Sequence, residues 1–309
     1  MKCENCGFEN PDSFKFCGQC GSKMPVYNEC PKCHTTFPSY GRFCPNCGTQ
    51  VRVEQNDTDS MLGRGIGPEE LEFIVGSCRF KMIRVDGGTF TMGATKEQGN
   101  NARDDERPTH QVTLSDYYIG QTEVTQALWK AVMGESVTQN ANLYTFGVGA
   151  DYPMYYISYD DCTTFVNKLN TLLSSQLGGK RFALPTEAQW EFAARGGNKS
   201  KGYKYAGSNN FYEVAWYGGG KTHPVAQKQP NELGLFDMSG NVWEWCKDWY
   251  DNYSSNAQKN PQGPADGTYR VYRGGSRSSC ADYCRVFHRG YDTPDKRSGS
   301  LGLRLCLLP

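Results

Sequence analysis

Eight of the fourteen cysteines lie in the first 47 residues, and their spacing is typical of metal binding. Within each half of this segment, two Cys-x-x-Cys pairs are separated by ten residues, and the second half repeats the first after 27 residues. Two such pairs supply the four thiolates of a tetrahedral zinc site. The sequence therefore predicts a tandem zinc ribbon over residues 1–50 with two structural zinc ions. Its ligands are Cys3, Cys6, Cys17, Cys20, Cys30, Cys33, Cys44 and Cys47.

Other uses of these cysteines agree less well with the sequence. Structural disulfides belong to secreted proteins, and the N-terminus has no apolar signal-peptide core. Cys30-x-x-Cys33-His34 matches the pattern for haem attachment, but the pair that follows it favours zinc. A closed four-thiolate site leaves no coordination position for catalysis, so we expect the ribbons to dock onto a protein or to mediate oligomerisation. Because so short a segment cannot bury a core, metal binding would supply its folding free energy.

A second pair of thiols, Cys280 and Cys284, follows the turn Arg273-Gly274-Gly275-Ser276. Two thiolates in the right register could hold a soft ion such as copper(I) and let it activate oxygen. The residues around the pair are mainly Ser, Asp, Tyr, Arg and Gly, a composition typical of recognition surfaces. The residues alone leave both chemistries open.

Composition excludes several classes of function. The formal net charge is zero and the pI is near 6.9, so no global field attracts nucleic acid or an anionic membrane. No apolar run approaches the roughly 20 residues that span a bilayer. Signatures of zinc proteases, α/β-hydrolases and kinases are absent. We therefore expect a cytoplasmic protein that does not bind membranes or nucleic acid. The charge run Asp104-Asp105-Glu106-Arg107 is predicted to be a solvated loop.

The elements that must position these groups follow from local signals. Residues 51–70 are polar with spaced glycines and are predicted to be a linker, and residues 71–309 form one domain. Strands are predicted over 80–85 and 89–93. Helices are predicted to begin after Thr125, after Ser158 with Asp161, and after Thr186 with Gln189. Short helices among many strands and loops indicate the α+β class.

Six segments follow one another along the chain: Gly87–Gly93, Glu123–Thr125, Leu184–Gly197, His223–Val225, Asn231–Trp245 and Arg273–Ser276. Together they resemble the sulfatase-modifying-factor family, whose founding member is the formylglycine-generating enzyme. The resemblance covers residues 80–309 and implies a variant C-type-lectin-like fold.

The resemblance also implies metal sites. A calcium ion would be held by the side chains of Asp237 and Glu244 and by the carbonyls of Gly240 and Val242, a set of oxygens that calcium prefers. The alternative is that these groups only hydrogen-bond the turn.

For copper(I), the second family thiolate falls on Cys284 but the first falls on Ser279, one residue before Cys280. The register therefore predicts loss of oxidase activity, and no catalytic residue is favoured. If the domain is an oxidase, its residues are Cys284, Cys280 and Ser276.

The C-terminus also resembles the variable region of proteins encoded with diversity-generating retroelements, which use this fold as a binding scaffold. We expect the C-terminal loops to bind a protein or another macromolecular ligand. The predicted ligand-binding residues are Arg277, Ser278, Ser279, Asp282, Tyr283, His288, Tyr291, Asp292, Ser298 and Ser300.

Overall fold

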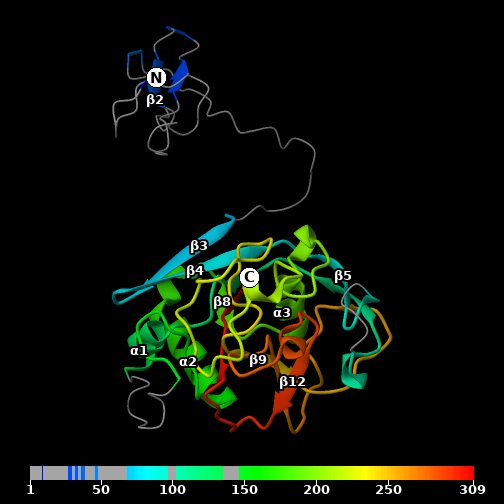
Figure 1. Ribbon diagram of the computed structural model, residues 1–309. Helices are drawn as coiled ribbons and strands as arrows, with labels where there is room; N and C mark the ends of the chain where they lie inside the picture. Colours follow the sequence, from blue (N-terminus) through cyan, green and yellow to red (C-terminus); the bar gives the residue numbers. More distant parts are fainter. Residues whose placement is uncertain are drawn as a thin grey trace. The chain divides into compact units, whose positions relative to one another are not determined.

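The computed structural model (Figure 1) describes Glu9 and residues 27–29, 32–33, 36–38, 46–47, 68–96, 102–134 and 146–309. The chain divides into an N-terminal unit, Met1–Ile66, and a C-terminal unit, Gly67–Pro309. The division falls within the predicted linker. Six predicted zinc ligands lie outside the described residues, namely Cys3, Cys6, Cys17, Cys20, Cys30 and Cys44.

The described part of the N-terminal unit contains an antiparallel hairpin. Strand β1 (Tyr27–Glu29) pairs with β2 (Thr36–Pro38), with Asn28 opposite Phe37. The segment between them carries Cys33, whose Sγ accepts a hydrogen bond of 3.7 Å from Nδ2 of Asn46. Asn46 precedes Cys47, so the hairpin turn and the last Cys-x-x-Cys segment lie next to each other. This is the arrangement that a shared zinc site between the third and fourth cysteine pairs requires.

The C-terminal unit is built on a five-stranded sheet in the order β3-β4-β7-β14-β8. The strands β3 (Glu70–Val75), β4 (Cys78–Val85) and β7 (Tyr117–Gly120) are adjacent and pair antiparallel. The last strand, β14 (Cys306–Leu308), lies between β7 and β8 (Arg181–Ala183) and pairs antiparallel with both. The C-terminus is therefore fixed in the middle of the sheet.

Two smaller sheets complete the unit. One has the order β12-β11-β9-β13, with β9 (Trp243–Trp249), β11 (Arg270–Arg273), β12 (Arg289–Asp292) and β13 (Leu301–Gly302). The other has the order β10-β6-β5, with β5 (Gly88–Met92), β6 (His110–Leu114) and β10 (Gln258–Lys259). Within this unit β3 and β4 lie at one end and β12 lies at the other (Figure 1). The loops that flank β12 carry the residues predicted to bind ligand.

The three predicted helix starts are confirmed. Helix α1 (Gln126–Met133) is capped by Thr125, and α2 (Tyr159–Leu172) and α3 (Glu187–Ala194) begin with the capping boxes Ser158/Asp161 and Thr186/Gln189. Helix α1 packs on α2 through Trp129 and Phe165, whose rings stack at 5.0 Å. A fourth short helix, α4 (Phe211–Val214), follows. No helix of the described chain has the length and apolar character to cross a membrane.

Helix α3 is buried on nearly all sides, unlike a helix that packs only one face on a sheet. Besides Trp190 and Ala194, the acidic residues Glu187 and Glu191 are also buried. The helix contacts β5, β9 and β11, so it is surrounded by sheet rather than laid on one. Buried carboxylates need partners. Those partners come from the segments that carry the C-terminal loops.

Candidate functional site

A buried ion-pair network anchors the C-terminal loops to helix α3. Arg289, at the start of β12, donates from Nε and Nη2 to the two carboxylate oxygens of Glu187 at 2.8 and 2.7 Å. Arg273, at the end of β11, pairs with Glu191 and lies 3.4 Å from Glu187. Burial alone would raise the pKa of Glu187, but Arg289 and Arg273 outweigh it and hold that pKa below its usual value. Buried ion pairs to helix α3 therefore hold both ends of the loop between β11 and β12.

The loop leaves β11 through two glycines in the left-handed region. Gly274 has φ +100° and Gly275 has φ +78°. A Cβ on Gly275 would lie 2.5 Å from Sγ and 2.9 Å from Cα of Cys284, so the turn packs directly against that residue. This close approach buries the Cys284 thiol beneath the turn.

The two candidate catalytic thiols lie in different environments. Cys284 is buried, and burial together with the nearby Cys280 raises its pKa to about 12, so the thiol is protonated at neutral pH. Cys280 is exposed and precedes the single-turn helix Ala281–Cys284. The thiolate, not the thiol, is the metal ligand and nucleophile. Cys284 therefore lacks the electropositive surroundings of a reactive cysteine.

The first family thiolate position is occupied by a hydroxyl group. Ser279 accepts a hydrogen bond of 3.0 Å from the Ser276 backbone nitrogen, and the hydroxyls of Ser276 and Ser279 lie 3.1 Å apart. Hydroxyl oxygens are hard donors, whereas copper(I) selects soft sulfur. These residues therefore do not fit a two-thiolate copper site in the register of the family, and no oxidation step follows from them.

The predicted calcium ligands are engaged in protein contacts. Both oxygens of Glu244 accept hydrogen bonds from Arg304 at 2.7–3.0 Å, and Oε2 also accepts one from Nε1 of Trp190 at 2.6 Å. Asp237 accepts one from Ala226 at 2.8 Å, and its second oxygen is buried with no partner among the described residues. Because Arg304 already neutralises Glu244, this donor set does not fit calcium held by Asp237, Gly240, Val242 and Glu244. The turn itself is fixed by Glu123, which accepts from Val242 and Asn241.

The acidic run at residues 104–107 corrects a prediction. Glu106 is fully buried rather than solvated, and its Oε1 lies 2.8 Å from Nδ1 of His288 and 3.5 Å from Nη2 of Arg285. Burial alone would raise the pKa of Glu106, but the contacts with His288, Arg103 and Arg285 hold it below the usual value. Through Glu106, the run thus contacts the buried side of the C-terminal loops. The pattern of charges along the chain carried no sign of this partner because the two segments are 182 residues apart.

The predicted ligand-binding residues divide into exposed and buried groups. Ser278, Tyr283 and Tyr291 are exposed, and Asp282, Asp292, Ser298 and Ser300 are partly exposed. The other three are buried, which corrects their predicted role as contact residues: Arg277, Ser279 and His288 are 6%, 7% and 2% exposed. The guanidinium of Arg277 lies 4.0 Å from the Phe146 ring centroid and donates to carbonyls of Gly220 and Gly299. These three residues support the surface instead of forming it.

Tyrosines from other segments extend this surface, and the sequence analysis did not identify them. Tyr212 is 69% exposed, and its ring lies 5.7 Å from that of Tyr217, which packs beside Ala281 on the hydrophobic cluster that contains Cys284. On another side Tyr291 lies 3.9 Å from Tyr250 and 5.3 Å from Tyr269. Among the described residues seven large hydrophobic side chains are exposed, and four of them are tyrosines: Tyr212, Tyr269, Tyr283 and Tyr291. The sequence signal was a local density of Tyr and Trp in loops, without helical or strand periodicity.

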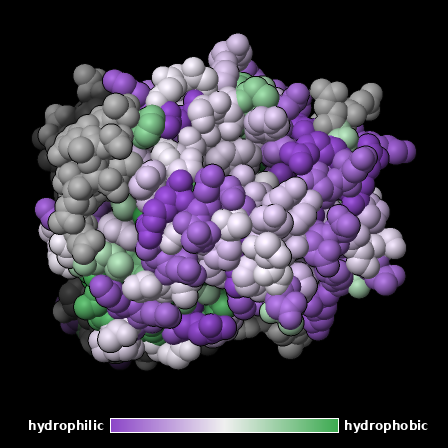
Figure 2. All heavy atoms as spheres, turned by 90° about the horizontal axis from the view of Figure 1, so that it is seen from below, coloured by the Kyte–Doolittle hydropathy of each residue, from purple (hydrophilic) through white to green (hydrophobic). Residues whose placement is uncertain are grey.

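The face on which β12 lies is hydrophilic to intermediate in character and carries only small hydrophobic areas (Figure 2). Ser278 and Ser300 form a hydroxyl pair at 3.0 Å on this surface, and the ring of Tyr283 packs on that of His288 at 4.9 Å. Serine hydroxyls and tyrosine rings can contact many different partners without the aggregation risk of an aliphatic patch. We call Ser278, Asp282, Tyr283, Tyr291 and Ser300 the loop surface.

Fold and site together define an α+β, formylglycine-generating-enzyme-type domain of the C-type-lectin-like kind, preceded by a tandem zinc ribbon. The chain belongs to the family of sulfatase-modifying factor enzyme 1-like domains, whose profile matches residues 77–307. A double zinc ribbon profile matches residues 3–48. Both assignments confirm the resemblances that the motifs carried.

Proteins with different names and roles share this domain. The formylglycine-generating enzyme of Streptomyces coelicolor is 31% identical over 286 residues, which span 72% of this chain and 87% of that protein. Chaperone protein LppX of Paenibacillus barcinonensis is 30% identical over 265 residues, which span 72% and 88%. Among solved structures, Treponema denticola variable protein 1 is 33% identical with a TM-score of 0.68, and the match covers 79% of this chain and all of that one.

Proposed function

We propose that the C-terminal unit is a binding module whose loop surface contacts a protein or another macromolecular ligand. The observation that carries this proposal is the division of the loops into a buried framework and an exposed set of Ser, Asp and Tyr side chains. Tyrosines supply large rigid contacts at low entropic cost, and serines adapt their hydrogen bonding. The similarity to a variable protein supports the proposal.

We further propose that the exposed loop positions are diversified by a retroelement. Substitutions at Ser278, Tyr283 or Ser300 leave the buried ion pairs intact, so the surface can change while the fold is retained. The test is to sequence this gene across many cells of the source strain, together with the neighbouring DNA. We expect substitutions concentrated at loop-surface codons, and a near-copy of the 3′ segment beside a reverse transcriptase. An invariant loop sequence with no such near-copy would remove the diversification proposal.

The competing function is a copper-dependent oxidase that uses Cys280 and Cys284. A copper(I) titration of the zinc-loaded full chain, in the presence of a competing chelator, separates the two. We expect the wild type and the Cys284→Ser variant to take up copper(I) equally, because Cys284 is a buried thiol of raised pKa. Comparison with the variant removes any contribution of the ribbon thiols. A tight one-to-one site that disappears in Cys284→Ser would overturn the binding-module proposal.

For the N-terminal unit we propose two structural zinc ions and a docking role. The double zinc ribbon profile over residues 3–48 and the contact between Asn46 and Cys33 support the metal assignment. Four thiolates per ion leave no open coordination position, so the unit has no means of zinc catalysis. Docking is tested by comparing the oligomeric state of the full chain before and after zinc is removed.

A further inference from the structure

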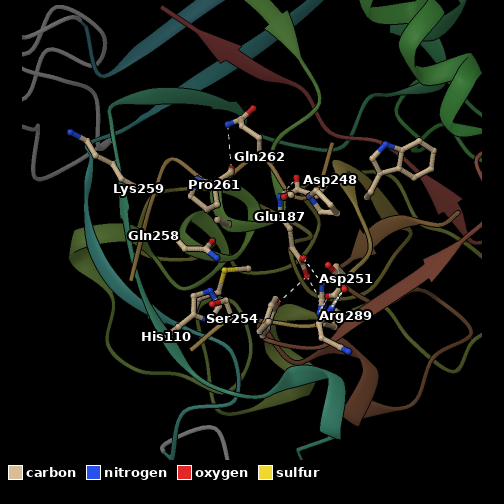
Figure 3. A pocket seen from close by; sticks show the side chains of 17 residues that line it. His110, Glu187, Asp248, Asp251, Ser254, Gln258, Lys259, Pro261, Gln262 and Arg289 are labelled. Atoms are coloured by element: carbon tan, nitrogen blue, oxygen red, sulfur yellow. Dashed lines mark hydrogen bonds and ion pairs between the residues drawn. The ribbon is translucent and has the colours of Figure 1, made fainter. Parts of the chain in front are cut away.

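A cavity of about 550 Å³ lies beside the start of helix α3 (Figure 3). Its walls come from the start of α3, the ends of β5 and β9, the starts of β6 and β12, strand β10 and the loops that follow β9 and β10. The lining side chains include Met92, His110, Asp248, Tyr253, Pro261 and Arg289. Neither candidate thiol and none of the loop-surface residues lines it.

One buried carboxyl in this cavity lacks a counter-ion. Asp248 is 5% exposed, and its Oδ2 accepts a hydrogen bond of 2.9 Å from the Glu187 backbone nitrogen. Within the described part of the chain its Oδ1 has no hydrogen-bond partner, and Asp248 forms no ion pair. An ionised carboxylate that is buried without a partner is costly. Asp248 thus presents an unused acceptor to the cavity.

The cations near Asp248 contact other groups and act on Asp248 only from a distance. Glu187 is held by Arg289 at 2.7 and 2.8 Å and by the Tyr253 hydroxyl at 3.0 Å. Arg270 lies 3.4 Å from the Trp249 ring centroid, and Lys247 donates to Gln262 at 2.7 Å. The remaining titratable groups around Asp248 are Tyr159, beside Arg270, the buried Cys246 of β9, and His110 and Asp251 on the cavity walls. Lys259 extends away from the cavity (Figure 3).

We propose that this cavity binds a small organic cation, a primary ammonium or guanidinium group, with Asp248 as its counter-ion. Such a group donates hydrogen bonds to Oδ1 and adds positive charge beside a carboxyl that Arg289 and Lys247 compensate only in part. Met92, Tyr253 and Pro261 offer apolar surface for the aliphatic stem that carries the charge. A neutral polyol could donate to the same oxygen, but it would leave the buried charge uncompensated.

Binding is coupled to the protonation of Asp248. Burial, with a contribution from Glu187, raises the pKa of Asp248 to about 7. A cation binds the ionised form, and the ionised fraction rises from about one tenth at pH 6 to about nine tenths at pH 8 for a pKa of about 7. The affinity for a cation should therefore increase about tenfold between pH 6 and pH 8.

The proposal is tested by calorimetric titration of the zinc-loaded full chain. The probes are the methyl esters of Nα-acetyl-lysine and Nα-acetyl-arginine, with the neutral Nα-acetyl-norleucine methyl ester and methyl glucoside for comparison. We expect one-to-one binding of a cationic probe, with about tenfold higher affinity at pH 8 than at pH 6. The Asp248→Asn variant should bind at least about tenfold more weakly and without this pH dependence.

Matched controls make the result decisive. Asp266→Asn removes the same charge from an exposed position outside the cavity and should leave binding unchanged. The melting temperature of Asp248→Asn reports whether that variant is folded, since asparagine can still accept the hydrogen bond from Glu187. Absence of binding by both cations, or equal binding of norleucine ester or glucoside, would overturn the proposal. A pH dependence that persists in Asp248→Asn would assign the titration to another group and would also overturn the proposal.

Discussion

At the scale of single residues, buried arginines determine the shape of the candidate site. Arg273, Arg289 and Arg304 are each almost completely buried, and each pairs with a glutamate from another segment. Loss of one partner from such a pair leaves a buried charge uncompensated and costs about 3–5 kcal/mol. The exposed Ser and Tyr side chains nearby make no such contacts. Substitution of the exposed side chains therefore costs little stability, whereas substitution of the buried arginines costs much.

Asp248 is expected to destabilise the ligand-free fold at neutral and alkaline pH. Its pKa is about 7 in the folded state against an ordinary value of 3.8, so the unfolded chain binds fewer protons between these values. The free energy of unfolding should therefore fall as pH rises from about 4 to about 7. Asp248→Asn should raise the free energy of unfolding at pH 8 by about 1–4 kcal/mol.

Urea unfolding at pH 5 and pH 8 tests whether the Asp248→Asn variant is more stable than the wild type at the higher pH. All six tryptophans lie between residues 129 and 249, so their fluorescence reports on the C-terminal unit alone. Asp266→Asn serves as the matched loss of one carboxylate. If Asp248→Asn is no more stable than the wild type at pH 8, then Asp248 is compensated by a group that the account leaves out.

Which of the predicted contact residues face outward could not be read from the sequence. The composition of the loops predicted a recognition surface, but Arg277, Ser279 and His288 point inward because carbonyls, a backbone nitrogen and Glu106 satisfy them there. These partners lie far along the chain or depend on the turn conformation. Tyr212 and Tyr217 were missed for the same reason, since they reach the loops only through packing.

At the scale of elements, the caps of α1, α2 and α3 were predictable because their signals are local. At α2 and α3 a Ser or Thr is followed three positions later by an acidic or amide residue, and at α1 the cap is Thr125 alone. The full burial of α3 was not predictable. Glu187 and Glu191 give the helix a polar pattern, and only the arginines of β11 and β12 make it an interior helix.

The turn after β11 should not tolerate a side chain at Gly275. Gly275→Ala places a Cβ at φ +78° and within 3.0 Å of Cys284 and the Tyr283 carbonyl, so we expect a loss of about 3 kcal/mol or more. Gly218→Ala is the matched control, because its φ is +61° but nothing lies within 4 Å of the added Cβ. That variant should lose only about 1–2 kcal/mol. Equal losses in the two variants, measured by urea unfolding, would show that the packing against Cys284 is unimportant.

At the scale of the whole molecule, the two units should respond separately to loss of zinc. The C-terminal unit buries a large core of its own, and the zinc ions proposed for the N-terminal unit would supply the folding free energy of that unit. We expect a chelator to release two equivalents of zinc and to leave the tryptophan melting transition within about 2 °C of its original position. A shift of this transition much beyond that would mean that the ribbons stabilise the C-terminal unit. Zinc-loaded protein without chelator, heated in the same buffer, is the control.

We propose that the loop surface can vary in sequence while the buried ion pairs beneath it cannot. The most direct test compares two libraries displayed on cells, scored for folded protein by protease resistance and then for binding to a panel of immobilised proteins. One library randomises Ser278, Asp282, Tyr283, Tyr291 and Ser300, and the other randomises the buried Arg277, Ser279, Arg285, His288 and Arg289. We predict that most members of the first library stay folded and that binders are selected from it, while most members of the second unfold. Equal loss of folded protein in both libraries would contradict the account.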